Sequence, residues 1–109
     1  MMGKLRFFIR HNDQMLQEKF ILVFKSEEAL AFFKEKLKGS RFEEVSSESA
    51  LHAARLGING KTVPYGYTTM LTPEEKSKLS LANWDETAEL LAEGNERLYR
   101  KAMEKVKKE

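Results

Sequence analysis

Five consecutive apolar residues, FILVF at positions 20–24, constrain the fold of this 109-residue chain more than any other segment. Successive side chains of a β-strand point to opposite faces of its sheet. If this segment is a strand, both of its faces are apolar and both must be covered. We therefore expect it to lie in the centre of a sheet.

The residues before this segment predict an antiparallel neighbour for it. Residues 4–10 alternate with the period of a strand. Residues 11–14, HNDQ, then supply the small polar side chains that are typical of a turn. We expect a hairpin in which Leu5, Phe7 and Ile9 share one face and Arg6, Phe8 and Arg10 share the other.

A helix is predicted over residues 26–38. Ser26 is a favoured N-cap, acidic residues follow it in the first turn, and Gly39 stands where helices commonly end. Residues 41–45 then resemble a short strand, which gives a β-α-β unit whose helix covers one face of the sheet. The buried stripe of this helix is expected to consist of Leu30, Phe33 and Leu37, widened by Phe32.

The middle of the chain predicts one more short helix and an irregular extended stretch. Residues 46–56 form the helix, with Gly57 ending it, and Asn59-Gly60 is a strong tight-turn signal. Pro64 and Gly66 reduce residues 61–70 to an edge strand or an ordered loop. The residues of the helix that are expected to face the core are Ala50, Leu51 and Ala54.

The C-terminal part is predicted to be helical. Thr72-Pro73-Glu74-Glu75 combines an N-cap, a proline at the first helical position and a glutamate at the third, and this helix should end near Leu81. From Trp84 to residue 107 a single helix would be about 36 Å long, whereas a compact domain of this size is about 33 Å across. The helix must therefore bend or project, and we favour a break at Gly94-Asn95. An intact helix would favour self-association.

Together these elements predict an α+β fold in a single domain over residues 1–109. A three- or four-stranded, mainly antiparallel sheet should occupy about residues 4–70, and a helical part about residues 72–107. Hydrophobic residues make up 41% of the chain and charged residues 33%, which is the balance of a folded domain.

Composition excludes several classes of function. The chain has no cysteine, so disulfides, thiolate nucleophiles and cysteine-ligated metals are ruled out, and we expect no metal or other cofactor. Charged residues interrupt the apolar residues of the N-terminus, unlike in a signal peptide, and no segment approaches the ~20 apolar residues of a membrane span. We expect a cytoplasmic protein without a membrane partner.

The segment GINGKT at positions 57–62 superficially resembles a phosphate-binding loop. That loop needs four residues between its glycines, whereas this segment has two. The nucleic-acid clamp with a Gly-x-x-Gly loop needs a helix directly afterwards, and Pro64 opposes one. We interpret the segment as a helix end followed by a turn.

The best candidate for a binding surface is one face of the first strand. Arginines interleaved with an aromatic ring suit single-stranded nucleic acid, because the charges bind phosphates and the ring stacks on bases. The net charge of the chain is only +2, but residues 1–25 hold five basic residues against two acidic ones. The alternative, which we favour, buries Phe8 under a helix and leaves the arginines at a solvated edge. The candidate partner-binding residues are Arg6, Phe8, Arg10, His11, Tyr65 and Tyr67.

The case for an enzyme depends on two histidines. His52 lies at helical spacing from Glu48 and Arg55, and a histidine oriented by a carboxylate can act as a general base. A solvated helix face has the same pattern, and we favour that interpretation. His11, in the first turn near Asp13, is treated in the same way, and no catalytic residue is assigned. Trp84 is expected to pack in the core with Leu79 and Leu81.

We therefore expect a small, non-catalytic binding module that acts through a macromolecular partner. The partner is either a protein, which would make the chain a regulator or inhibitor, or a nucleic acid bound by the first hairpin. The alternative is a small enzyme that uses His52 or His11 as its general base. A homo-oligomer formed through the C-terminal helix is a further expectation.

Overall fold

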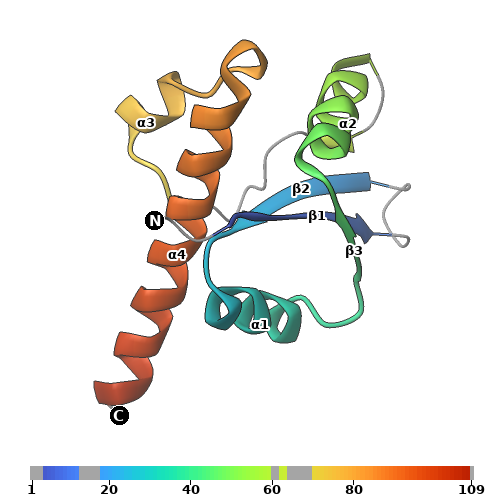
Figure 1. The fold of residues 1–109 in the computed structure, drawn as a ribbon. Coiled ribbons are helices and arrows are strands. Elements are labelled where there is room, and N and C mark those ends of the chain that lie inside the picture. Colours follow the sequence, from blue (N-terminus) through green and yellow to red (C-terminus); the bar gives the residue numbers. More distant parts are fainter. Residues whose placement is uncertain (1–3, 13–17, 60–61, 64–69, 109) are drawn as a thin grey trace.

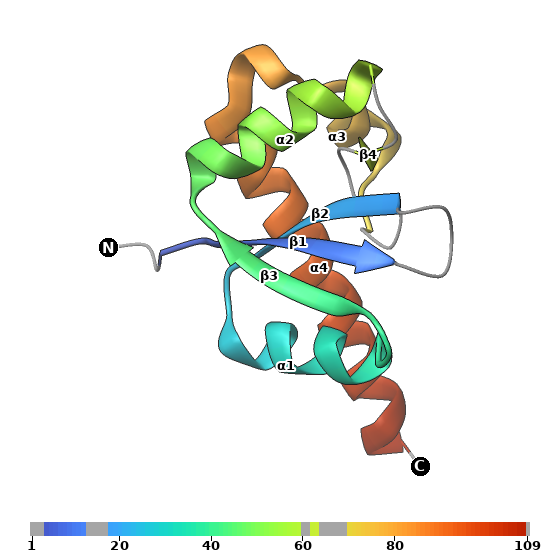
Figure 2. The same cartoon turned by 90° about the vertical axis from the view of Figure 1, so that its right-hand side faces the viewer.

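The apolar strand lies inside a sheet that has helices on both faces (Figures 1 and 2). The structure is a computed structural model that describes residues 4–12, 18–59, 62–63 and 70–108. Its fold is α+β, as the sequence predicts.

Three antiparallel strands form the body of the sheet. Strand β1 (Arg6–Asn12) lies between β2 (Glu18–Phe24) and β3 (Arg41–Val45) and is antiparallel to both. The two-residue strand β4 (Thr62–Val63) pairs in parallel with the start of β2, so the order is β3-β1-β2-β4. The predicted hairpin and the central position of residues 20–24 are confirmed. All five of these residues are at most 5% exposed.

Helix α1 (Glu27–Lys36) covers one face of the sheet. The Ser26 side chain accepts a hydrogen bond from the Ala29 N–H at 3.1 Å, which confirms the predicted N-cap. Gly39 has a φ of +97°, a conformation that glycine adopts without strain, and it follows the helix as expected. The core on this face consists of Phe8, Leu22, Phe24, Ala29, Leu30 and Phe33.

Helix α2 (Ser47–Asn59) and the first half of α4 (Trp84–Lys108) cover the opposite face. The prediction that α2 ends at Gly57 is wrong, because the helix continues to Asn59. A glycine costs about 1 kcal/mol in a helix interior, which does not by itself end a helix that is anchored on the sheet. The core on this face consists of Phe7, Ile21, Val23, Ala50, Ala54, Trp84, Ala88, Leu91 and Ala92.

The segment between the sheet and α4 contains a shorter helix than predicted. Helix α3 (Pro73–Ser77) has the expected capping box at Thr72, but it ends at Ser77 and not near Leu81. Ser80 adopts an extended conformation and begins a separate 3₁₀ turn, η1 (Leu81–Asn83). The fully buried Thr87 hydroxyl accepts from the Ser80 N–H and donates to the Ser80 carbonyl, both at 2.8 Å. These two bonds, from a side chain seven residues further along, hold Ser80 in its extended conformation.

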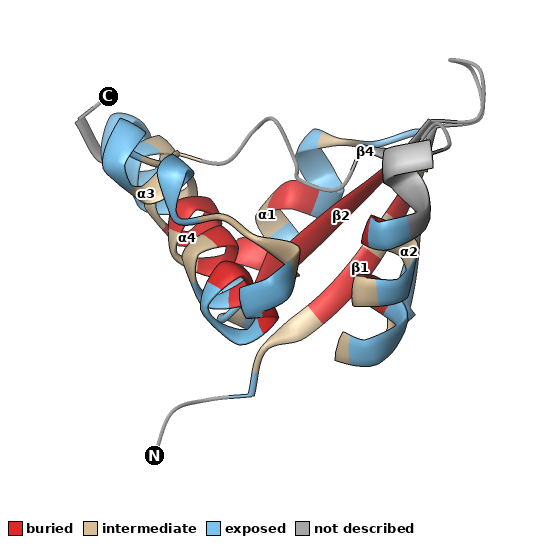
Figure 3. Ribbon diagram, turned by 90° about the horizontal axis from the view of Figure 1, so that it is seen from above, coloured by how far each residue is buried: buried red, intermediate tan, exposed pale blue. Residues whose placement is uncertain are grey.

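Helix α4 is continuous, so the predicted break at Gly94-Asn95 is wrong. Asn95 does not begin a new helix. Its side chain is 1% exposed and donates a hydrogen bond to the carbonyl of Val23 on β2 at 2.9 Å. The middle of α4 is thereby held against the sheet, and its buried side faces β2 in Figure 3. The longest dimension of the protein is 45 Å, and the C-terminal turns of α4 project beyond α1 (Figure 1).

Candidate functional site

Arg6 is engaged within the fold. Its guanidinium donates to both carboxylate oxygens of Glu44 on β3, at 2.9 and 2.7 Å, and also to Glu27 in the first turn of α1 at 2.5 Å. These charge-assisted bonds raise the pKa of Arg6 and lower the pKa of the Glu44 carboxyl. Arg6 therefore links β1 to β3 and α1.

The other predicted binding residues of the first strand are also buried or in contact with other side chains of the fold. Phe8 is 2% exposed and lies in the core under α1, so its ring has no open face for stacking. Arg10 is not at a solvated edge, because it is 9% exposed, donates to the Ser40 hydroxyl at 2.9 Å and lies over the ring of Phe20. His11 Nε2 lies 2.9 Å from a carboxylate oxygen of Glu43.

The remaining predicted residues do not extend this surface. Tyr65 and Tyr67 lie outside the described residues. His52 is exposed on α2. His52 and His11 are absent from the linings of four surface cavities in the described part of the chain. The contact of His11 with Glu43 matches the pairing of a histidine with a carboxylate that the enzyme hypothesis requires, but it lies outside these cavities.

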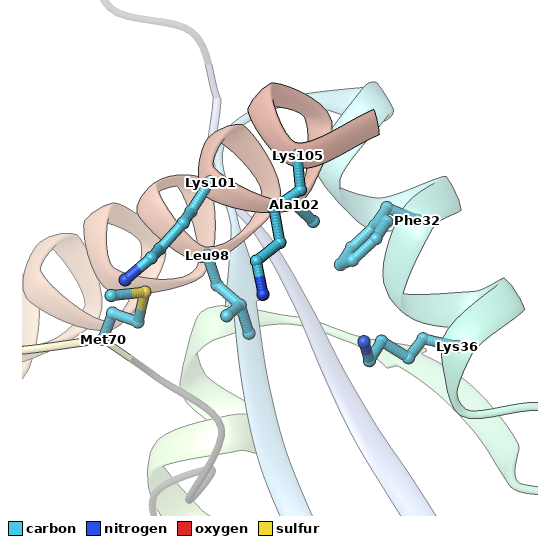
Figure 4. Close-up of a pocket in the computed structure, with 7 residues that line it drawn as sticks. All are labelled: Phe32, Lys36, Met70, Leu98, Lys101, Ala102 and Lys105. Atoms are coloured by element: carbon cyan, nitrogen blue, oxygen red, sulfur yellow. The ribbon is translucent and has the colours of Figure 1, made fainter. Parts of the chain in front are cut away.

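A groove of about 380 Å³ lies where the projecting half of α4 passes α1. Its floor and walls are apolar and half-buried. Phe32 comes from α1, Leu98 and Ala102 come from α4, and Met70 comes from the segment before α3 (Figure 4). We call this cavity the α1–α4 groove.

Three exposed lysines complete the lining of the α1–α4 groove. Lys101 and Lys105 are one helical turn apart on α4, and Lys36 stands on α1 (Figure 4). None of the three forms an ion pair with a carboxylate in the described part of the chain, and no acidic residue is part of the lining. The Lys36 ammonium lies 5.6 Å from the centre of the Phe32 ring. The groove is thus an apolar surface with a positively charged rim.

An ion pair between α4 and α3 positions Met70 in this groove. The Arg97 guanidinium donates to both carboxylate oxygens of Glu75 at 2.6 and 2.8 Å, and to the Met70 carbonyl at 3.4 Å. The Met70 N–H donates to the carbonyl of Gly94, also at 3.4 Å. Glu75 in turn accepts from the Thr72 N–H as part of the capping box. Arg97 and Glu75 therefore hold the segment before α3 against α4.

This ion pair predicts a specific loss of stability in acid. The bonds from Arg97 and Thr72 lower the pKa of Glu75 from its ordinary 4.5 to about 2. Because the folded state favours the carboxylate, its stabilising contribution is fully present above pH 4.5 and disappears as the pH falls from 4.5 to 2. Glu75→Gln should therefore melt below the wild type at pH 7, and the difference should vanish near pH 2.

Thermal unfolding followed by circular dichroism across this pH range measures the effect. Glu74→Gln is the matched control, because Glu74 is an exposed neighbour in the same helix turn. It removes the same charge, and its difference from the wild type should be small. A melting difference for Glu75→Gln that does not depend on pH would contradict the assigned role of the carboxylate.

The groove was not among the sites predicted from sequence, although part of its signal is local. Leu98 and Ala102 lie on the apolar side of the last helix, and Lys101 and Lys105 are four residues apart on the same helix. Basic and acidic residues mixed at helical spacing are typical of a solvated helix face, so these lysines do not mark a site by themselves. The position of Lys36 opposite them depends on how α1 and α4 pack, and no local pattern indicates it.

In the described part of the chain, no helix combines the length and the apolarity that crossing a bilayer requires. Comparisons with models of protein families, with curated proteins and with solved structures found no match to this chain.

Proposed function

We propose that this chain is a non-catalytic binding module that recognises a protein partner through the α1–α4 groove. The observation that supports the proposal most is the combination of apolar floor and basic rim on a helix that extends beyond the sheet. Floor residues that are half-buried in the free chain have apolar surface left to bury against a partner. A groove between two helices is also a common mode of peptide recognition.

The protein partner is favoured over nucleic acid because of where the first-strand residues lie. Stacking on bases needs an open aromatic face, and Phe8 is in the core. Arg6, the most exposed arginine of that strand, already binds two carboxylates. Action in the cytoplasm and self-association through α4 stay predictions from the sequence.

Substitution of Ala102 by glutamate tests the proposal. A carboxylate there would fill the floor of the groove and pair with the neighbouring lysines, while glutamate keeps a high helix propensity. The tagged variant should no longer capture the proteins that the wild type captures from an extract of the source cell, identified by mass spectrometry. Its melting temperature should stay within a few degrees of the wild type, because Ala102 borders an open groove into which the longer side chain can extend.

Two controls make the result specific. Ala82→Glu introduces the same side chain at an exposed position in η1, at the other end of α4, and should capture the same proteins as the wild type. Nuclease treatment of the extract should leave capture unchanged. If Ala102→Glu captures the same proteins as Ala82→Glu, or if nuclease abolishes capture, the proposed function is wrong.

A further inference from the structure

We infer that the segment bound in the α1–α4 groove is an acidic peptide that carries an aliphatic anchor side chain. The inference rests on the proposed function and adds the chemical class of the partner. It starts from the charges of the groove. Lys36, Lys101 and Lys105 all belong to the lining, and no described carboxylate neutralises any of them.

In the described part of the chain, the basic residues next to the groove, unlike the groove lysines, lie beside carboxylates. Arg97, one turn before Lys101 on α4, binds Glu75 and lies 3.7 Å from Glu93. Arg100, the residue before Lys101, lies 3.6 Å from Glu96. Arg97 and Arg100 thus lie beside carboxylates, whereas in the described part of the chain no carboxylate forms an ion pair with a lysine of the groove. A ligand that supplies carboxylates would complete the same pattern.

The floor of the groove indicates that the ligand carries an apolar anchor side chain. Leu98, Ala102 and Met70 are aliphatic and present apolar surface, against which an aliphatic side chain of the ligand can be buried. Phe32 does not offer a stacking platform, because its ring packs against the rings of Phe33 and Tyr99 and the Lys36 ammonium lies over it. A nucleic-acid base would therefore find cations here without an open aromatic face.

The spacing of the lysines indicates how the carboxylates are arranged. Lys101 and Lys105 are four residues apart on one helix, which places them about one turn, or 6 Å, apart along the groove. Acidic residues four apart on a helical peptide match this spacing. A helical peptide would lie beside α1 and α4 as a third helix, with its aliphatic side chain between Leu98 and Phe32.

Titration of the ¹⁵N-labelled full chain with a synthetic peptide, followed by NMR, tests the inference. The probe is a helical peptide of about four turns in an alanine background, with glutamates four residues apart and leucines beside them on the same face. Two matched peptides replace either every glutamate by glutamine or every leucine by alanine. We expect the shifted amide signals to map to Phe32, Lys36, Leu98 and Ala102, binding that weakens as salt is added, and a loss of affinity of about tenfold or more with either matched peptide.

Variants of the protein complete the experiment. Lys101→Glu combined with Lys105→Glu should weaken binding of the acidic peptide by about tenfold. Lys76→Glu combined with Lys78→Glu makes the same change in net charge on exposed residues of the α3 region, and should change the affinity less than about twofold. If the groove lysines only complement the dipoles of α1 and α4, their reversal would lower the melting temperature and leave the affinity unchanged, which would overturn the inference.

Other ligands give outcomes that also decide the matter. If single-stranded DNA or vesicles of anionic lipid shift the groove signals at lower concentration than the peptide does, the acidic-peptide inference is wrong. If the glutamine peptide binds as tightly as the glutamate peptide, the inference is wrong as well. If Ala102→Glu abolishes capture but reversal of the two lysines does not, the proposed function stands. Only the inference that the partner is acidic would then be wrong.

Discussion

Replacing Phe8 by alanine should lower the free energy of unfolding by about 3–5 kcal/mol, the usual cost of deleting a buried phenylalanine ring. Phe8 is 2% exposed and packs edge-to-face with Phe24, with ring centres 5.9 Å apart. Phe8 belongs to the core between the sheet and α1. Its removal would leave a cavity surrounded by packed side chains that cannot easily move to fill it. This loss is a large part of the total stability of a domain, which is only about 5–15 kcal/mol. The variant should therefore melt roughly 15–25 °C below the wild type.

Urea and thermal unfolding measure this loss, and Phe42→Ala provides the control. Phe42 lies on the edge strand β3 and is half-buried, with its ring 6.2 Å from that of Phe8. Its truncation should cost clearly less. If both variants lost the same free energy of unfolding, the Phe8 ring would not be more deeply buried than the Phe42 ring. The result also bears on the nucleic-acid hypothesis, because lost binding by Phe8→Ala would report unfolding and not a missing stacking surface.

The second large effect is expected at Asn95, where α4 crosses the sheet. Asn95→Ala leaves the buried Val23 carbonyl without this donor and should cost about 2–3 kcal/mol. Asn95→Asp keeps the size of the side chain but places an oxygen where the amide N–H donates. When ionised, that carboxylate is buried and opposes the carbonyl, so the loss at pH 7 should be at least about 3 kcal/mol.

The pH dependence of Asn95→Asp distinguishes this mechanism from a packing defect. Burial raises the pKa of the introduced carboxyl above its ordinary value of about 3.9. A group with a raised pKa in the folded state is least destabilising when protonated, so the variant should approach the wild type in stability below about pH 4 and fall behind as the pH rises. Asn95→Leu, which has about the same size and no titratable group, is the matched control and should show no such trend. A loss for Asn95→Asp that is constant with pH would contradict the burial of this side chain against the Val23 carbonyl.

Asn95 also explains why the sequence suggested a broken helix. Glycine followed by asparagine is a common local signal for a helix end and a new cap. Here the asparagine bonds to a strand 72 residues away in the chain, and the continuous helix brings it there. The energy that compensates for glycine in the helix interior therefore comes from a contact between α4 and the sheet, which local patterns do not contain.

Part of the candidate site could also be predicted from the sequence, and part could not. The sequence indicated that Phe8 would be buried under a helix, because a strand residue beside a buried strand and followed by an amphipathic helix has few other places. It did not indicate that Arg6 would bind Glu27 and Glu44, which are 21 and 38 residues away. It also did not indicate that Lys101 and Lys105 would line a groove with Lys36, because nothing nearby in the chain marks Lys36 as their neighbour.

The sequence by itself determined the hairpin, the central apolar strand, and the helix starts at Ser26 and Thr72. These depend on period-two alternation and on side chains that bond backbone groups three residues away, so their causes lie within a short segment. Only the tertiary structure decided that α4 continues through Gly94, that α3 ends early, and that an apolar groove with three lysines lies between α1 and α4. The continuous α4 and the groove depend on contacts between residues far apart in the chain, and the end of α3 depends on the packing of Thr87, seven residues beyond Ser80. The free energies of these contacts outweigh local preferences of about 1 kcal/mol.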